Sequence, residues 1–213
     1  MTYVAIVVLS YLIGSFPTAL LVGRLVKGID IRTMGSGNMG ATNVFRVLGA
    51  PAGIVTLIVD VFKGFAATYW VSRLGSGDPV GLKILAGFSA ILGHTFTLFA
   101  KFRGGKGMAT AAGMLIAIAP NILLICVLVF VITVLLTGYV SVASLVGASL
   151  FGIIHIVLYI VGTGTYENLW LLFFSIVAPL FIFWTHRTNI QKLRRGEEHR
   201  FENLMIFKRK KTL

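Results

Sequence analysis

Residues 107–137 read GMATAAGMLIAIAPNILLICVLVFVITVLLT, and this stretch decides how many helices the chain contains. The stretch is long for one transmembrane helix and short for two, because one crossing needs about 17–25 apolar residues. The run is interrupted at residues 119–121, and a proline such as Pro120 disrupts the interior of a helix. We therefore predict two short helices that meet near Pro120.

The rest of the composition is that of a membrane protein. Hydrophobic residues make up 57% of the 213 residues, more than a soluble domain of this length needs. The apolar runs are continuous rather than alternating, which favours helices over a β-barrel. The class predicted is an all-α, polytopic membrane protein with a single integral membrane domain, residues 1–213. The other apolar segments lie at about 3–23, 49–72, 81–100, 139–161 and 168–185.

The basic residues predict the topology. Most of the 19 Lys and Arg residues lie in residues 24–46, 101–106 and 186–213. Cytoplasmic connections of membrane proteins are enriched in Lys and Arg. All three segments are cytoplasmic only if residues 107–137 cross the membrane twice. We therefore predict seven transmembrane helices, an N-terminus outside, and a basic cytoplasmic C-terminus from about residue 186.

The net charge of +12 limits the partners. In a membrane protein, basic connections favour anionic lipid headgroups and anionic substrates. No nucleic-acid-binding motif is present, so we expect no nucleic acid partner. Cys126 is the only cysteine, which excludes a disulfide within the chain or a thiolate metal site. We expect no metal and no cofactor.

A glycine-rich basic stretch, GSGNMGATNVFR, occupies residues 35–46. Glycines let the backbone turn tightly and point its N–H groups at an anion. Arg46 follows Thr42 by about one helical turn, so both side chains can face one ligand. The stretch predicts a phosphate site, with a flexible loop as the alternative. Its candidate ligands are Ser36, Asn38, Thr42, Asn43 and Arg46.

A second such stretch, KFRGGKGMAT, occupies residues 101–110. Gly104, Gly105 and Gly107 surround Lys106, and a helix is predicted to begin directly after them. A helix N-terminus presents N–H groups and a positive dipole to anions. The spacing does not fit a Walker A loop, so we do not expect nucleotide hydrolysis. A tight glycine-rich connection is the alternative.

The third stretch, THRTNIQKLRRGEEHRF, occupies residues 185–201 and follows the last predicted helix. His186, Asn189 and Leu193 share one face of a short amphipathic helix. Membrane anchoring explains the basic residues but not a histidine and an asparagine on the same face. We therefore predict that His186 and Asn189 belong to a functional site.

Several polar residues lie within the apolar segments. Asp60 and Lys63 are three residues apart, and charges inside a membrane are usually paired. An internal ion pair is the plainest interpretation. His94, near the second glycine-rich stretch, has either a structural or a functional role. Ser141 and Ser144 lie near the same predicted side and could donate to a ligand.

Familiar catalytic motifs are missing from the sequence. It has no G-x-S-x-G elbow, no H-E-x-x-H zinc motif and no H-x-x-x-x-D acid–base pair. What remains is a set of hydrogen-bond donors and cations. Such a set suits chemistry on phosphorylated substrates by positioning and electrostatic stabilisation.

Together, GSGNMGATNVFR, GHTFTLFAKFRGGKGMAT and HRTNIQKLRRGEE resemble the three signature regions of the bacterial membrane acyl-phosphate:glycerol-3-phosphate acyltransferases. The resemblance covers nearly the whole chain. It implies transfer of a fatty acyl group from acyl phosphate to the 1-hydroxyl of glycerol 3-phosphate. The products would be lysophosphatidic acid and phosphate, in the first step of phospholipid biosynthesis. It also implies a multi-pass protein of the bacterial inner membrane, with a cytoplasmic active site. A monomer could carry out such a function.

The resemblance also implies roles for single residues. Lys106 and Arg46 would stabilise the departing phosphate, and His186 and Asn189 occupy the catalytic positions. Glu198 would hold the third region together, and Ser144 is weakly favoured over Ser141 as the serine that contacts substrate. Residues 208–213 are a basic extension that the family does not require. Phosphate binding is implied for Ser36, Asn38, Thr42, Asn43, Gly104, Gly105 and Gly107.

Two questions stay open at this point. The proton acceptor is either His186 or an oxygen of the substrate phosphate. The competing functions are a phosphate or organophosphate transporter and a non-catalytic scaffold for lipid headgroups. Neither acyl-chain preference nor oligomeric state follows from the sequence.

Overall fold

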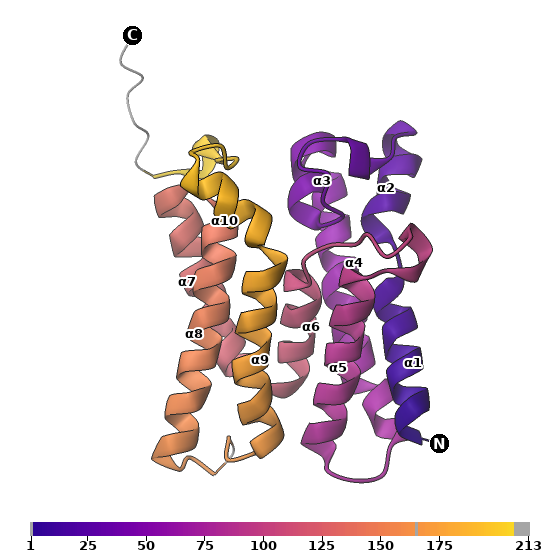
Figure 1. Cartoon of the computed structure of the whole chain (residues 1–213), viewed down its shortest axis with the longest axis vertical. Coiled ribbons are helices and arrows are strands. Elements are labelled where there is room, and N and C mark those ends of the chain that lie inside the picture. The colour runs from indigo at the N-terminus through magenta and orange to yellow at the C-terminus, as the bar shows by residue number, and fades with distance from the viewer. Residues whose placement is uncertain (1, 165, 207–213) are drawn as a thin grey trace. The chain divides into compact units, whose positions relative to one another are not determined.

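The computed structural model describes residues 2–164 and 166–206, and every regular element in these ranges is a helix (Figure 1). The predicted all-α class is therefore confirmed. The chain forms two compact units, unit 1 (Met1–Pro120) and unit 2 (Asn121–Leu213). A single domain over the whole chain stays a prediction. The basic extension 208–213 lies outside the described residues.

Unit 1 holds six α-helices and three short 3₁₀ helices among the described residues. The α-helices are α1 (Thr2–Ser15), α2 (Thr18–Lys27), α3 (Ala41–Leu48), α4 (Ala50–Tyr69), α5 (Pro79–Thr95) and α6 (Met108–Ile118). The 3₁₀ helices are η1 (Ile31–Thr33), η2 (Val71–Leu74) and η3 (Leu98–Ala100). Unit 2 is built from α7 (Pro120–Thr137), α8 (Val140–Val161), α9 (Leu169–Thr185), α10 (Arg187–Arg194) and η4 (Glu202–Leu204).

The predicted break in residues 107–137 is present. Helix α6 ends at Ile118 and α7 begins at Pro120, with Ala119 outside helical geometry. Proline is well tolerated at the first position of a helix because its missing N–H would have no partner there. The 11 residues of α6 rise only about 16 Å at 1.5 Å per residue, about half the thickness of the hydrocarbon core.

Five helical segments are long and apolar enough to cross a membrane. They are Tyr3–Lys27, Ala50–Leu74, Pro79–Ala100, Pro120–Thr137 and Val140–Val161. Helices α9 and α10 form a sixth candidate, bent by 57°. The count of seven and the sides of the termini therefore remain predictions.

Within unit 1, α1 packs along α5, and α4 packs along α5 and α6. Glycines let α4 and α6 approach closely. A β-carbon on Gly64 would overlap the carbonyl oxygen of Thr110, and one on Gly113 would overlap that of Val61. Small residues are common where membrane helices pack, because they let the backbones meet.

Within unit 2, α8 packs along α9. Gly152 faces this contact, and a β-carbon there would lie 2.7 Å from the carbonyl oxygen of Ser175. Pro179 lies inside α9, also against Gly152. The same use of small residues thus brings the helices of unit 2 together.

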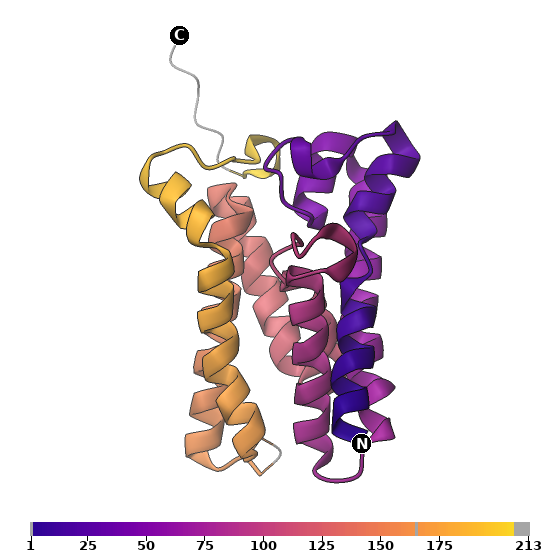
Figure 2. The ribbon, with the colours of Figure 1, turned by 45° about the vertical axis from the view of Figure 1, so that its right-hand side comes forward.

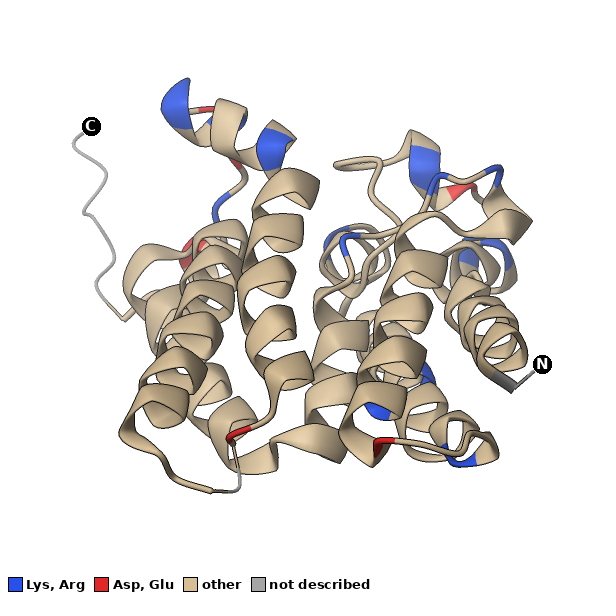
Figure 3. Cartoon of the chain, turned by 60° about the horizontal axis from the view of Figure 1, so that its bottom comes forward, with Lys and Arg blue, Asp and Glu red and all other residues tan. Residues whose placement is uncertain are grey.

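Charged residues lie mainly in connections and at helix ends, and the middles of the helices are nearly free of them (Figure 3). In unit 1, the connection after α2 and the connection after α5 lie at the same end, opposite the N-terminus (Figures 1 and 2). These two connections carry the first and second glycine-rich stretches, which the fold therefore brings together.

Candidate active site

Asn43 holds the first glycine-rich loop in shape. Its side chain is only 1% exposed, and its Nδ2 donates to the carbonyl oxygens of Met34 at 3.0 Å and Ile31 at 3.3 Å. Its Oδ1 accepts from the backbone N–H of Ser36 at 2.9 Å. Because both Nδ2 and Oδ1 of Asn43 are hydrogen-bonded to the backbone around it, this side chain fixes the conformation of the loop. If Asn43 supports phosphate binding, it does so through the loop backbone.

The other predicted ligands of this loop are more accessible. Ser36 is exposed, and Asn38, Thr42 and Arg46 are partly exposed. Arg46 lies on α3, and its Nη1 donates to Oδ1 of Asn43 at 3.4 Å. Asn43 therefore also orients the guanidinium group that was predicted to bind phosphate.

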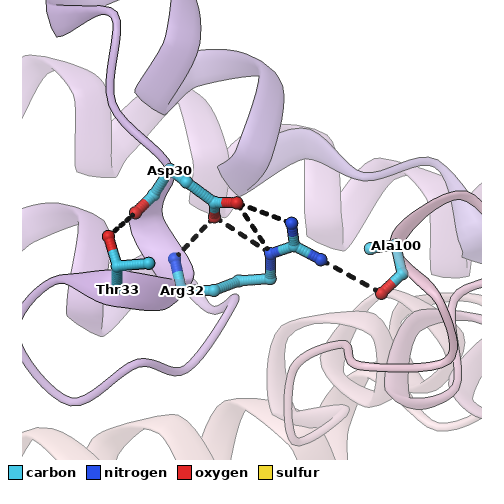
Figure 4. Close-up of polar contacts among 4 residues, drawn as sticks. All are labelled: Asp30, Arg32, Thr33 and Ala100. Carbon is cyan, nitrogen blue, oxygen red and sulfur yellow. Dashed lines mark hydrogen bonds and ion pairs between the residues drawn. The ribbon is translucent and has the colours of Figure 1, made fainter.

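A charged bridge links the segments that lead into the two glycine-rich loops (Figure 4). Arg32 pairs with Asp30, with 2.9 Å between Arg32 Nε and Asp30 Oδ1, and its Nη1 donates to the carbonyl oxygen of Ala100 at 3.3 Å. Hydrogen bonding from Arg32 lowers the pKa of Asp30 from 3.8 to about 2. The bridge thus fixes the first loop to the connection that leads into the second.

The second glycine-rich loop lies directly on the last turn of α5. The N–H of Gly104 donates to the carbonyl oxygen of Thr95 at 3.0 Å, and that of Gly105 donates to the carbonyl oxygen of His94 at 3.1 Å. A β-carbon on Gly105 would overlap Nε2 of His94. Glycine is therefore needed here for the close approach of the backbone. Because both N–H groups are used internally, other groups must provide the donors for an anion.

Lys106 and the start of α6 are two parts of this loop that could bind an anion. Lys106 is partly exposed, and Gly107 precedes α6 with a φ of 85°. The first N–H groups of a helix have no partner within the helix, and its dipole favours anions at this end. A phosphate site at this loop would therefore use Lys106 and the N-terminus of α6.

His186 lies in unit 2 at the junction of α9 and α10 and is 3% exposed. Its Nδ1 lies 2.8 Å from the carbonyl oxygen of Ile182. A carbonyl oxygen only accepts, so in this arrangement Nδ1 carries the hydrogen and Nε2 of the neutral ring is the acceptor atom. The fold thus selects one of the two tautomers.

Asn189 and Glu198 are joined across the turn that follows α10. Asn189 Nδ2 donates to Glu198 Oε1 at 2.7 Å. The predicted short helix in this region is present as α10. The bond gives Glu198 a direct way to orient Asn189, and the structural role expected for Glu198 stays a prediction.

The chain after α10 is fastened to the connection between α7 and α8. Arg200 Nε donates to the carbonyl oxygen of Thr137 at 2.8 Å, and the N–H of Phe201 donates to that of Gly138 at 2.9 Å. The Arg200 guanidinium also lies 5.4 Å from the centre of the Tyr139 ring. Unit 2 therefore places the third motif beside the start of α8.

Ser141 and Ser144 differ in their contacts. Ser144 Oγ donates to the carbonyl oxygen of Val140 at 2.9 Å. Ser141 is 5% exposed, and its Oγ has no hydrogen-bond partner among the described residues. A serine hydroxyl that donates to the backbone can still accept, so both serines stay candidates.

Three residues of these arrangements had no predicted role. Asp30 and Arg32 form the bridge between the loops, and Arg200 fastens the third motif. The sequence shows them only as charges in basic connections, where membrane anchoring explains them. The Asp30–Arg32 pair is local, but the contacts of Arg32 with Ala100 and of Arg200 with Thr137 join residues far apart in the chain, and local spacing carries no signal for them.

The fold and these arrangements define a class: a helical membrane protein with two basic, glycine-rich loops at one end of unit 1 and a His–Asn pair in unit 2. The profile of the family described as glycerol-3-phosphate acyltransferase matches residues 4–196. The chain belongs to this family of membrane acyltransferases, which serves phospholipid biosynthesis.

Relatives and solved structures agree with this. The chain is 44% identical to a glycerol-3-phosphate acyltransferase of Pelodictyon phaeoclathratiforme, covering 94% of this chain and 97% of the relative. It is 43% identical to one of Chlorobaculum parvum, with the same coverage. It is also similar to the crystal structure of PlsY (YgiH), an integral membrane glycerol 3-phosphate acyltransferase, in its glycerol 3-phosphate form. The TM-score is 0.84 and the identity 34%, over 96% of this chain and 98% of that one. The lysophosphatidic acid form of that protein gives a TM-score of 0.80.

Proposed function

We propose that this chain transfers a fatty acyl group from acyl phosphate to the 1-hydroxyl of glycerol 3-phosphate. The products are lysophosphatidic acid and inorganic phosphate, and the step opens phospholipid synthesis. The observation that carries the proposal is that two cationic glycine-rich loops lie at one end of unit 1, where Arg32 ties the segments that lead into them. The similar PlsY structures, in glycerol 3-phosphate and lysophosphatidic acid forms, support the acceptor and the product.

In the proposed reaction, two cationic side chains bind the phosphate group that leaves the acyl donor. Lys106 and Arg46 lie on the two joined loops and neutralise charge as the bond between the acyl carbon and the phosphate oxygen breaks. Ser36, Asn38 and Thr42 complete the pocket for the donor phosphate. Preorganised cations aimed at developing charge are among the strongest sources of catalysis.

The acceptor hydroxyl attacks the acyl carbon directly. Its proton goes either to Nε2 of His186, the acceptor atom of the neutral ring, or to an oxygen of the substrate phosphate. Asn189, oriented by Glu198, and Ser141 or Ser144 position the acceptor. We expect no acyl-enzyme intermediate, and trapping one would contradict direct transfer.

We further propose seven transmembrane helices, with the glycine-rich loops and α10 facing the cytoplasm of a bacterial inner membrane. Acyl phosphate would enter from the bilayer and glycerol 3-phosphate from the cytosol. The enzyme would act as a monomer, without a metal or other cofactor. The positive-inside rule supports this topology, because the basic residues are concentrated in those connections.

The decisive experiment measures inorganic phosphate released from palmitoyl phosphate by purified protein, with and without glycerol 3-phosphate. We expect release that requires the acceptor and is matched by an equal amount of lysophosphatidic acid. Lys106→Ala should abolish it, while Lys83→Ala, on α5, serves as the control. No release from folded protein, in detergent and in lipid, together with glycerol 3-phosphate flux into liposomes, would favour a transporter instead.

A further inference from the structure

Three ionisable residues meet inside unit 1, where the proposed chemistry does not use them. Asp60 and Lys63 of α4 and His94 of α5 are 1%, 4% and 5% exposed. Lys63 Nζ lies 2.8 Å from Asp60 Oδ1, which confirms the predicted ion pair, and His94 Nδ1 lies 3.7 Å from the same oxygen. Replacing a buried ion pair by apolar residues is often neutral or stabilising, so stability alone is a weak reason to retain one.

The cluster holds the break between α1 and α2. The chain leaves helical geometry at Phe16 and Pro17, and Lys63 Nζ donates to the carbonyl oxygen of Phe16 at 3.1 Å. Thr18, at the start of α2, donates from its Oγ1 to Asp60 Oδ1 at 3.0 Å. The ion pair therefore sets where α2 begins, and α2 leads through η1 to the first glycine-rich loop.

His94 connects the cluster to the second loop. Its carbonyl oxygen accepts from Gly105, and its ring lies against the Gly105 backbone where a β-carbon would overlap Nε2. The next residue along the chain is Lys106. A change in the position of the imidazole ring would therefore move the backbone that carries Lys106.

A small pocket adjoins the same residues. Its lining includes Asp60, Lys63 and His94 together with Met39, which belongs to the first glycine-rich loop. Asp60 Oδ2 is buried and has no hydrogen-bond partner among the described residues. The cluster thus borders both loops, and one oxygen of the Asp60 carboxylate has no hydrogen bond within the described ranges.

We propose that Asp60, Lys63 and His94 are positioning residues that set both glycine-rich loops, and Lys106 above all, for binding phosphate. The inference rests on the proposed function, because it assigns these residues to that same site. Asp60 pairs with Lys63 and lies beside the His94 ring, Lys63 fixes the Phe16 carbonyl, and His94 supports Gly105. None of the three needs to touch the substrate.

The test compares Asp60→Asn, which keeps shape but removes charge, with Lys83→Met. Lys83 lies on α5, outside the cluster, and donates to the carbonyl oxygen of Ala117 at 3.3 Å. We expect Asp60→Asn to raise the KM for glycerol 3-phosphate or acyl phosphate by about ten- to a hundredfold, as misplacement of a site by about 1 Å can do. Lys83→Met should leave both KM values near wild type. A wild-type KM in folded Asp60→Asn would overturn the proposal.

A double variant, Asp60→Asn with Lys63→Met, separates positioning from plain stabilisation. Removing both charges should restore much of the melting temperature lost in Asp60→Asn, since no unpaired buried charge remains. If the cluster positions the loops, the KM stays raised. If the KM returns to wild type together with the melting temperature, the cluster only stabilises the fold and the proposal fails.

His94 gives a second, milder test. His94→Gln keeps a nitrogen near the place of Nε2, the atom that lies against Gly105, whereas His94→Leu does not. We expect His94→Gln to retain a lower KM than His94→Leu at similar melting temperatures, and equal KM values would contradict the proposal.

Binding of inorganic phosphate, measured as a rise in melting temperature, makes the result independent of turnover. Weaker phosphate protection in Asp60→Asn than in Lys83→Met supports positioning even if wild-type protein releases no phosphate from palmitoyl phosphate. The absence of phosphate release from palmitoyl phosphate would overturn only the proposed function. Equal protection in the two variants would overturn the positioning proposal.

Discussion

Gly105 has a side-chain hydrogen where any other residue would have a β-carbon, and that β-carbon would overlap the His94 ring. The residue was predicted as part of a phosphate loop, with its N–H aimed at an anion. In the structure this N–H donates to the His94 carbonyl oxygen. What glycine provides at this position is a close approach between the loop and α5.

We expect Gly105→Ala to shift the loop and raise the KM for phosphate-bearing substrate by about tenfold or more, given the sensitivity of catalysis to misplacement. Gly147→Ala is a matched control, because the new β-carbon would lie at an ordinary 3.8 Å from the Cys126 carbonyl oxygen. Steady-state kinetics on both variants checks this. Equal KM values would show that the loop accommodates the methyl group.

Asp30 gives a prediction for pH. Its pKa is lowered from 3.8 to about 2 by Arg32, so the folded state favours the charged carboxylate. The stabilisation is therefore complete above about pH 4 and is lost as the pH falls through about 2. Melting temperatures of wild type and Asp30→Asn should differ by a constant amount at neutral pH. The difference should shrink between about pH 4 and pH 2, and a difference that grows toward low pH would contradict this assignment.

At the scale of elements, one side-chain hydrogen bond joins α10 to the chain beyond the turn that follows it, in addition to backbone bonds such as that from Glu197 to Lys192. Asn189 donates to Glu198 across that turn, and the chain then reaches the connection between α7 and α8. Amphipathic periodicity predicted the helix itself. The fastening to the α7–α8 connection joins residues about 60 positions apart, and such contacts cannot be inferred from periodicity.

Glu198→Gln keeps an acceptor for Asn189, whereas Glu198→Ala removes it. Hydrogen bonds to charged groups contribute about 1.5–3 kcal/mol, so we expect Glu198→Ala to lower both stability and kcat. Glu198→Gln should lie between that variant and wild type. Unfolding curves and turnover assays measure this. If Glu198→Ala behaved as wild type, the bond would have no role in holding Asn189.

At the scale of the whole molecule, topology is the main prediction. In a Cys126→Ala background, single cysteines can be labelled in intact cells by a membrane-impermeant maleimide. Seven spans predict labelling from outside for Ser76→Cys and Asn121→Cys, and none for Thr188→Cys until the membrane is permeabilised. Protection of Asn121→Cys in intact cells would show that α6 and α7 do not cross as two separate spans.

The sequence by itself determined the class, the break at Pro120, the three motifs and the charge of the site, because hydrophobicity, proline and glycine act locally along the chain. Tertiary structure alone decided which contacts the polar residues make. Asn43 and Gly105 shape their loops, Arg32 ties the segments that lead into the loops, and Asp60, Lys63 and His94 meet inside unit 1. The physical reason is that a buried polar atom must find its partner wherever packing places it, and that partner can lie anywhere along the chain.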